Sequence, residues 1–346
     1  MADLMKAGVI TAPYEFEIRE IPIPEPGPGE VLIRQKAVAL CTMEQRVYTG
    51  VKKFPYPGCW GHEVAGVVEK VGPENKTQLK EGDHVVLGVP YFCGECEYCT
   101  RGLEEHCLAD FGLPKMEGII GLFGMAQYMV VESKRAIKVA SEIPFAEKAL
   151  AEPLGCVLQG IKKLNILERD TVVVVGAGTM GLLNVMAAKR RGARVVVSEI
   201  DPKRREKAEK LGADASFDPS KEDAEEAIQR LNDGRKADAV ILAIGNENAN
   251  KDAMKMTAKE GRILYFASAH PSVPFEVDPN FIHDTGIVLT GVKGKNLRDV
   301  WDAAAMLSSG TVKTDELIEE VYPLDKAQKA LEKASNNNTF RIVLEM

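Results

Sequence analysis

The chain has 346 residues, of which 45% are apolar and 27% charged, as in a soluble globular protein. This length favours two domains. The net charge of −7 argues against a basic surface for nucleic acid or an anionic membrane. The N-terminal segment lacks a basic start followed by a long apolar stretch, so we expect no signal peptide and a cytoplasmic protein.

The first 150 residues alternate short apolar runs with Gly and Pro, which is typical of β-strands joined by turns. A Pro-rich stretch leads into an expected strand at 31–40, and further strands are expected at 62–72 and 124–133. We expect residues 1–150 to be mainly β and to curl into a small barrel or sandwich.

Four cysteines in the segment 92–107 have the spacing C-x2-C-x2-C-x7-C. Four thiolates this close can hold a tetrahedral Zn2+ at about 2.3 Å from each sulfur, and such a closed site is structural. Disulfides are the alternative, but seven cysteines in a chain of this length do not resemble a disulfide scaffold. A zinc knuckle for nucleic acid is also disfavoured, because nearby acidic residues would repel phosphates. The predicted ligands are Cys93, Cys96, Cys99 and Cys107.

From residue 141 the pattern changes to helices alternating with strands. A helical stretch is expected at 141–164, and further helices are expected at 202–211 and 223–231. The expected strands are 171–175, 194–200, 238–244, 262–268 and 287–292. Near-continuous apolar strands with intervening helices predict a parallel, doubly wound sheet covered on both faces.

The final segment, 296–346, contains two amphipathic helical patterns and a last strand-like run at 341–346. We expect this segment to return to the first domain, because the β-rich half would otherwise have an open sheet edge.

A glycine-rich turn follows the apolar run 171–175. Its three glycines, Gly176, Gly178 and Gly181, enclose Thr179 and Met180. A G-x-G-x-x-G sequence between a strand and a helix predicts a dinucleotide site. The first glycine permits the turn, the second lets the backbone approach a pyrophosphate, and the third allows close helix packing. The helix N-terminus supplies N–H groups to the phosphates.

Glu199 stands at the end of the second strand of this pattern, 18 residues after Gly181. A carboxylate there accepts hydrogen bonds from the adenosine ribose and would repel a 2′-phosphate, which favours NAD over NADP. Asp201 is a competing acceptor. Arg204 and Arg205 are nearby basic residues that could instead favour NADP.

A second metal site is indicated by Cys41, His62, Glu63 and Glu152. Together these residues offer the sulfur, nitrogen and oxygen donors of an open Zn2+ site, in which one position is kept for water or substrate. The sequence alone does not show that they converge in space.

With these motifs the chain resembles the zinc-dependent medium-chain dehydrogenases/reductases of the alcohol dehydrogenase superfamily, nearest to the sorbitol and threonine dehydrogenase branch. The matching motifs run almost from end to end and are PGPGEVLIR (26–34), Cys41, GHEVAGVVEKVG (61–72), GDHVV (82–86), the four-cysteine lobe, GMAQY (124–128), EPL (152–154) and GAGTMG (176–181).

The resemblance implies a GroES-like catalytic domain at 1–150 with a zinc lobe at about 90–110, a Rossmann domain at 151–295, and a C-terminal return at 296–346. The active site would lie between the two domains. It further implies two Zn2+ per chain, a homodimer or homotetramer, and hydride transfer between NAD and a secondary alcohol such as a polyol. The alternatives are an amino alcohol such as threonine, a simple alcohol or aldehyde, and an inactive nucleotide-binding protein.

The resemblance also assigns roles to single residues. Cys41 and His62 match the catalytic zinc ligands, and Glu63 and Glu152 match two acidic positions that share the remaining coordination, with the choice between them open. Three further matches concern the cofactor: Glu199 with the ribose-binding acid, Arg204 with a basic residue near the same ribose, and Arg341 with a basic residue near the pyrophosphate.

The chain departs from the family around the first ligand, where the family usually has Cys-x-Ser/Thr-Asp. Here the residues are Cys41, Thr42, Met43 and Glu44, so a methionine replaces the hydroxyl of the proton relay. Thr42 is one substitute, and Glu63 or Glu152 with a water molecule is another. Glu44 can keep the role of the usual Asp. The nearby Arg46, Tyr48 and Trp60 are candidates for the pocket wall or for ordinary packing.

Overall fold

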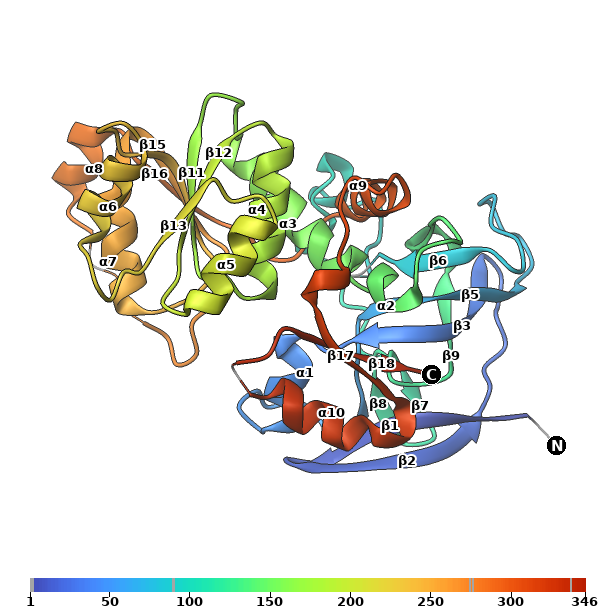
Figure 1. The fold of residues 1–346 in the computed structure, drawn as a ribbon. Helices are drawn as coiled ribbons and strands as arrows, with labels where there is room; N and C mark the ends of the chain where they lie inside the picture. Colours follow the sequence, from blue (N-terminus) through green and yellow to red (C-terminus); the bar gives the residue numbers. More distant parts are fainter. Residues whose placement is uncertain (1–2, 89–90, 274, 276, 337) are drawn as a thin grey trace. The chain divides into compact units, whose positions relative to one another are not determined.

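The computed structural model describes residues 3–88, 91–273, 275, 277–336 and 338–346. It contains two compact units: Met1–Gly155 with Lys295–Met346, and Cys156–Gly294. Figure 1 shows the elements of both units, coloured along the chain. Helix α3 (Ala151–Leu164) contains the first boundary, so Glu152 belongs to the first unit although most of its helix belongs to the second.

Two β-sheets form the first unit. One has the strand order β2-β1-β4-β8-β7; the other has the order β10-β6-β5-β3-β18-β17, with β9 also paired to β3. The strands before the four-cysteine lobe are β1 (Leu4–Ala12), β2 (Glu15–Pro22), β3 (Glu30–Ala39), β4 (Gly58–Cys59), β5 (Glu63–Val71) and β6 (His84–Leu87). Those after it are β7 (Lys115–Met116), β8 (Ile119–Gly121), β9 (Tyr128–Glu132) and β10 (Ala136–Lys138). The predictions of strands at 31–40, 62–72 and 124–133 are confirmed as β3, β5 and β9.

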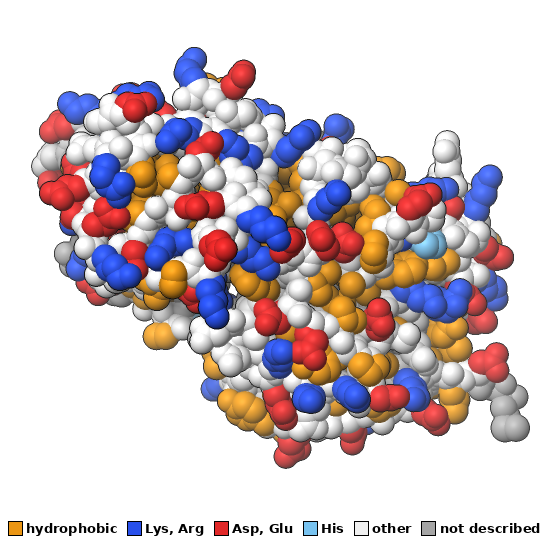
Figure 2. Space-filling view, in the orientation of Figure 1, with side chains coloured by type: hydrophobic (Ala, Val, Ile, Leu, Met, Phe, Trp, Pro, Cys, Tyr) orange, Lys and Arg blue, Asp and Glu red, His pale blue; other side chains and the backbone are white. Residues whose placement is uncertain are grey.

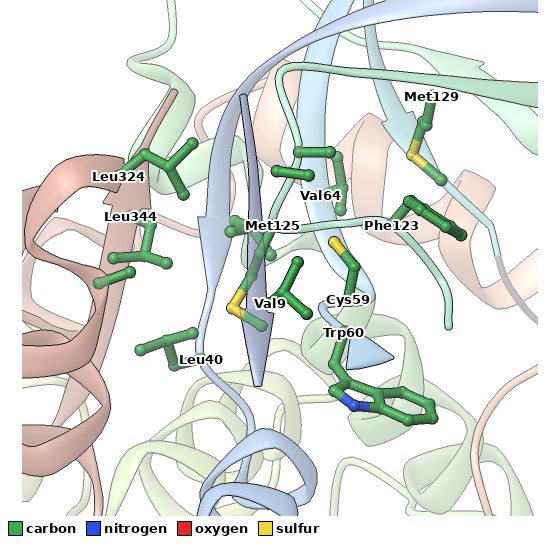
Figure 3. Packing of buried hydrophobic residues seen from close by; sticks show 14 of the residues in the cluster. Val9, Leu40, Cys59, Trp60, Val64, Phe123, Met125, Met129, Leu324 and Leu344 are labelled. Carbon is green, nitrogen blue, oxygen red and sulfur yellow. The ribbon is translucent and has the colours of Figure 1, made fainter. Parts of the chain in front are cut away.

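The core of the first unit is filled by apolar side chains from both sheets. Figure 3 shows this packing, with Val9 of β1, Val64 of β5 and Met129 of β9 among the labelled residues. Leu324 and Leu344, more than 190 residues later in the chain, belong to the same cluster. Each fully buried side chain of this kind contributes about 1.5–3 kcal/mol. The C-terminal segment is therefore part of the core of the first unit.

The C-terminal strand β18 (Arg341–Glu345) pairs antiparallel with β3, with Val343 opposite Ala39. Strand β17 (Ile318–Pro323) then pairs in parallel with β18. Without β18, these backbone groups of β3 would form an open sheet edge. The pairing also brings Arg341 to the end of β3, where its Nη1 donates to the Leu40 carbonyl at 3.1 Å.

The helices of the first unit are short, apart from α9. They are α1 (Thr42–Tyr48), α2 (Phe145–Lys148), α9 (Leu297–Ser308) and α10 (Ala327–Ala334). Single turns of 3-10 helix lie at Cys99–Arg101, Glu104–His106, Ser133–Arg135, Asp315–Leu317 and Leu324–Lys326. The helical stretch predicted at 141–164 is confirmed over most of its length, as the two helices α2 and α3. Pro153, which lacks a backbone N–H, stands in the first turn of α3, where an N–H would have no intrahelical partner.

The second unit contains one parallel sheet with the order β13-β12-β11-β14-β15-β16, which is that of a doubly wound nucleotide-binding fold. Its strands are β11 (Thr171–Val175), β12 (Arg194–Ser198), β13 (Ala215–Phe217), β14 (Ala237–Leu242), β15 (Thr257–Tyr265) and β16 (Val288–Gly291). The predicted α/β class, a mainly β region with a doubly wound parallel sheet, is confirmed. The sequence reading missed β13, which has only three residues and is too short for a periodic pattern.

Helices connect the strands of this sheet. They are α4 (Thr179–Arg190), α5 (Pro202–Lys210), α6 (Ala224–Leu231), α7 (Glu247–Met256) and α8 (Pro279–Thr285). Asp201 and Asp223 begin α5 and α6, where their side chains accept backbone N–H groups of the first turn. The predictions of helices at 202–211 and 223–231 are thus confirmed, with α6 starting one residue later.

Acidic and basic side chains are interspersed over the surface that Figure 2 shows. Among the described residues, none of the helices combines the length and the apolar character needed to cross a membrane.

Candidate metal and nucleotide sites

Cys41 stands between β3 and α1, at the N-cap of the helix. Its backbone is extended, and its N–H donates to Glu44 Oε2 at 3.1 Å. Glu44 lies three residues later in the first turn, so its side chain folds back over the start of the helix. The local sequence thereby places a thiol and a buried carboxylate side by side.

Glu44 also contacts His62, which immediately precedes β5. Glu44 Oε1 lies 2.8 Å from His62 Nδ1 and accepts the Gly61 N–H at 3.1 Å. When Nδ1 donates to this carboxylate, Nε2 is left to bind a metal. That Glu44 takes the place of the aspartate usual in the family stays a prediction.

The structure brings Cys41, His62 and Glu63 together, with one donor atom from each within 4.8 Å of the others. Glu63 Oε2 is buried, and no described residue donates a hydrogen bond to it. A buried carboxylate oxygen without a partner is unfavourable, and a cation bound between these three side chains would satisfy it. Sulfur, nitrogen and oxygen donors at this separation fit a Zn2+ site with one open position.

Glu63 is also paired with Arg341, whose Nη2 lies 3.0 Å from Glu63 Oε1. Both side chains are almost completely buried. Burial raises the pKa of Glu63 to about 7, although Arg341 acts in the opposite direction. The structure therefore places Arg341 among the metal-site residues of the first unit.

Glu152 is the fourth predicted metal ligand, and it lies slightly outside the group of Cys41, His62 and Glu63. Its Oε1 is 3.7 Å from His62 Nε2 and forms an ion pair with Lys295, which is only 5% exposed. Burial opposes the ionisation of Glu152, but Lys295 and then His62 outweigh burial and hold its pKa below the ordinary value. The sequence reading missed Lys295, since a lone lysine more than 140 positions from its partner carries no local signal.

The charges around this site match a divalent cation. Three carboxylates (Glu44, Glu63 and Glu152) and the Cys41 thiolate would carry four negative charges, and the buried Arg341 and Lys295 balance two of them. The pKa of His62 lies well above its ordinary value because, although burial acts against the imidazolium, Glu44 and Glu152 outweigh burial. The site thus attracts positive charge, as a metal centre should.

The other candidate residues around the first ligand differ in how far their side chains are exposed. The Thr42 side chain is exposed at the start of α1, whereas Met43 packs against the apolar core. Tyr48 and Trp60 are each 1% exposed and belong to this core, which favours the packing interpretation for both. Arg46 is half-buried in α1.

The four-cysteine lobe has the geometry of a closed metal site. All four sulfurs lie within 4.8 Å of one another, and Cys93 Sγ is 3.6 Å from Cys107 Sγ and 3.9 Å from Cys99 Sγ. Sulfurs bound tetrahedrally to Zn2+ lie about 3.8 Å apart, whereas a disulfide needs about 2.05 Å. The structure describes all four cysteines and joins none of them in a disulfide. This spacing favours the zinc interpretation over the disulfide alternative.

Backbone N–H groups of the lobe point at its sulfurs. Cys96 N donates to Cys93 Sγ, and Cys93 N donates to Cys107 Sγ, both at 3.3 Å. N–H groups of Leu108 and then Cys99 lower the pKa of Cys96 to about 6. The Cys93 N–H likewise lowers the pKa of Cys107, whereas burial raises the pKa of Cys99 to about 12. Thiolates are the form that binds zinc.

The glycine-rich turn of the second unit has the shape expected of a phosphate-binding turn. Gly176 has φ +94°, and a Cβ on Gly181 would lie 1.9 Å from the Gly176 carbonyl oxygen, so both positions require glycine. A Cβ on Gly178 would meet nothing within 4 Å, so the space beside this glycine is open to a ligand. Thr179 and Met180 form the first turn of α4, for which Gly178 is the N-cap.

Glu199 lies directly beside this turn. Its Oε2 accepts the Ala177 N–H at 2.7 Å, and its Oε1 accepts the Asp201 N–H at 2.9 Å. Asp201 caps α5, accepting the Lys203 N–H. Arg205 Nη1 donates to the Glu199 carbonyl at 2.7 Å. All three side chains are therefore tied to the local backbone, and Glu199 is the acid that contacts the glycine-rich turn, at Ala177.

Two family models match the chain. The model described as an alcohol dehydrogenase GroES-like domain matches residues 27–141, and the model described as a zinc-binding dehydrogenase matches residues 179–309. The first match contains Cys41, His62 and the four-cysteine lobe, and the second contains Gly181 and Glu199.

Full-length relatives have a similar length. The chain is 31% identical to L-threonine 3-dehydrogenase of Thermococcus kodakarensis, over 99% of this chain and 98% of the relative. It is 32% identical to erythritol/L-threitol dehydrogenase of Mycolicibacterium smegmatis, over 95% and 93%. Among solved structures, a putative zinc-binding dehydrogenase from Sinorhizobium meliloti bound to NADP has a TM-score of 0.90 and 25% identity, covering 99% of this chain and 100% of that one.

Proposed function

Because the chain belongs to the zinc-dependent medium-chain dehydrogenases of the alcohol dehydrogenase superfamily, we propose that it transfers a hydride between a secondary alcohol and NAD. The observation that carries the proposal is the convergence of Cys41, His62 and Glu63 donor atoms within 4.8 Å. When bound, Zn2+ supplies Lewis acidity that lowers the pKa of an alcohol hydroxyl, and the nicotinamide accepts the hydride.

Cys41, His62 and Glu63 would hold the catalytic Zn2+, and Glu44 fixes the ring of His62 with Nε2 toward the metal. Arg341 contacts Glu63 Oε1, where it holds the side chain in place and opposes the rise in the Glu63 pKa that burial causes. The pyrophosphate contact that the family implies for Arg341 remains part of the proposal. Cys93, Cys96, Cys99 and Cys107 would hold a second, structural Zn2+, which gives two ions per chain.

The cofactor would bind along the glycine-rich turn, with its pyrophosphate at the N-terminus of α4 beside Gly178. Glu199 would accept the adenosine ribose hydroxyls, and Arg204 would lie near the same ribose. A buried carboxylate at this position disfavours a 2′-phosphate, so NAD is the proposed cofactor.

The proton of the alcohol needs a path that does not use Met43. The exposed hydroxyl of Thr42 is one candidate for this path, and Glu63 or Glu152 with a water molecule is the other. A Thr42→Val variant tests the first path: loss of turnover with unchanged bound zinc would support it, and unchanged turnover would exclude it.

We propose that the substrate is a polyol or another oxygen-rich secondary alcohol. We also propose that the protein is a homodimer or homotetramer. An amino alcohol such as threonine is the second candidate, because both substrate types occur among the relatives. The test is a panel of polyols, threonine and simple alcohols with NAD and NADP in parallel, followed by absorbance of the reduced nicotinamide. Polyol turnover with NAD supports the proposal, threonine turnover supports the second candidate, and no turnover with near one zinc per chain would indicate an inactive protein.

A further inference from the structure

We propose that Lys295 holds the Glu152 carboxylate away from the catalytic metal, so that Cys41, His62 and Glu63 are the protein ligands and the fourth position stays open for substrate. The inference rests on the proposed function, because it concerns how that metal site keeps a free position. It makes Lys295 a positioning residue, which acts through Glu152.

The first support is the particular oxygen that Lys295 engages. Glu152 Oε1 is the oxygen that lies 3.7 Å from His62 Nε2, and the same oxygen pairs with Lys295 Nζ. A zinc-bound carboxylate oxygen lies about 2.0–2.2 Å from the ion. The ammonium of Lys295 therefore competes for the oxygen that is nearest to the metal donors.

The Glu63–Arg341 pair differs in this respect. Arg341 contacts Glu63 Oε1, whereas Oε2 of Glu63 is buried without a hydrogen-bond donor among the described residues. One oxygen of Glu63 is thus left for a metal while the other is held by a cation. Both carboxylates are paired with a buried cation, but the cation contacts different oxygens relative to the metal donors. We therefore take Glu63 as a metal ligand and Glu152 as a residue that Lys295 holds beside the site.

The second support is the burial of the pair. Lys295 and Glu152 are each 5% exposed, and separating them would leave an unpaired buried ammonium, which is strongly unfavourable. Lys295 is also fixed along the chain, because the next residue, Asn296, is the N-cap of α9 and its N–H donates to Asp299 at 2.9 Å. Glu152 is fixed in the first turn of α3. Neither partner can move away easily.

The consequence is that removal of Lys295 frees Glu152 to become an additional ligand. The test is a double-mutant cycle of Lys295→Met and Glu152→Gln. The protein used carries Co2+ in the site formed by Cys41, His62 and Glu63, and it keeps Zn2+ in the four-cysteine lobe. Two quantities are measured without substrate: the Co2+ dissociation constant, by chelator competition, and the d–d absorption spectrum, which reports coordination number.

We expect Lys295→Met to tighten Co2+ binding by about tenfold when Glu152 is present and by less than about threefold in the Glu152→Gln background. Its d–d spectrum should change, because Glu152 takes the fourth position in place of water, and Glu152→Gln should remove this change. Lys295→Arg should keep the wild-type spectrum. Lys293→Met, which removes an exposed lysine two positions earlier, is the matched charge control and should leave the spectrum unchanged.

Equal tightening in both backgrounds would show that Lys295 acts only through its charge and would overturn the proposal. If Lys295→Met does not fold, Glu152→Gln alone still decides: an altered cobalt spectrum would show that Glu152 is already a ligand and would equally overturn it. These readouts need no turnover. If the protein oxidises alcohols but the effect of Lys295→Met on Co2+ binding does not depend on Glu152, only this inference is contradicted. If that effect depends on Glu152 but the protein shows no turnover, only the proposed function is contradicted.

Discussion

Glu44 Oε1 lies 2.8 Å from His62 Nδ1, and the same oxygen accepts the Gly61 N–H. Glu44 is completely buried, and its other oxygen accepts the N–H of Cys41. One carboxylate therefore fixes both the histidine ring and the backbone that carries the cysteine. The two candidate ligands come from different parts of the chain and share this single support.

Replacing Glu44 with Gln should weaken metal binding at the Cys41 site by about 10- to 100-fold, because outer-shell partners of ligating histidines have effects of this size. The measurement is chelator competition for the metal bound at the Cys41 site. Glu44→Asp, which restores the residue usual in the family, is the control and should lose less. Identical affinity in Glu44→Gln would contradict the orienting role.

Replacing His62 with Ala should abolish alcohol oxidation and leave NAD affinity almost unchanged, because His62 lies in the first unit and the glycine-rich turn in the second. Turnover and cofactor fluorescence titration measure the two effects separately. His106→Ala, at a half-exposed histidine of the lobe, should change neither. An equal loss of turnover and NAD affinity would count against this division of roles.

Replacing Glu199 with Ala should raise the dissociation constant for NAD by about tenfold or more, because hydrogen bonds to a charged acceptor are each worth about 1.5–3 kcal/mol. Affinity for NADP should fall less or improve, since a negative charge is removed. Asp201→Ala should instead lower stability by about 1 kcal/mol through loss of the α5 cap and leave NAD binding nearly unchanged. The reverse pattern would identify Asp201 as the ribose acceptor.

Replacing Cys107 with Ser should reduce bound zinc from about two to about one per chain, since a closed site that loses a thiolate binds zinc far less well. Elemental analysis of purified protein measures this ratio, and thiol titration under native conditions should show increased reactivity of Cys93, Cys96 and Cys99. Cys59→Ser, at a buried cysteine outside both clusters, is the control and should keep both ions. Two retained ions in Cys107→Ser would exclude the four-sulfur site.

The buried Lys148 should make the free energy of unfolding depend on pH. Its side chain is completely buried at the end of α2, with Nζ 2.6 Å from His84 Nδ1, and burial lowers its pKa from 10.5 to about 8. Between these two values the unfolded chain binds more protons than the folded one, so the Lys148 contribution to the free energy of unfolding increases as pH rises from about 8 to 10.5.

Relative to Lys148→Met, the wild type should therefore gain on the order of 2 kcal/mol of stability between pH 7.5 and pH 10.5. Urea unfolding of both proteins at the two pH values measures this gain, and the comparison cancels the other titrating groups. A parallel pH dependence of the two proteins would show that Lys148 is not perturbed in the folded state.

Local patterns were enough to predict the strands β3, β5, β9 and β11, the helices α5 and α6, and the turn at Gly176–Gly181. Each of these depends on neighbours within a few positions, such as alternating burial or a side chain that caps its own helix. Elements without such a pattern were missed: β13 has three residues, and the N-cap of α1 is Cys41, which is not one of the usual capping residues.

The sequence by itself determined the donor types, the cysteine spacing and the glycine positions, because metal coordination and backbone conformation constrain which residues can stand there. Only the tertiary structure decided which carboxylate meets which cation. Arg341 reaches Glu63 because β18 pairs with β3, and Lys295 reaches Glu152 because the C-terminal segment rejoins the first unit. Such long-range pairs are set by strand register and core packing, which no short stretch of sequence contains.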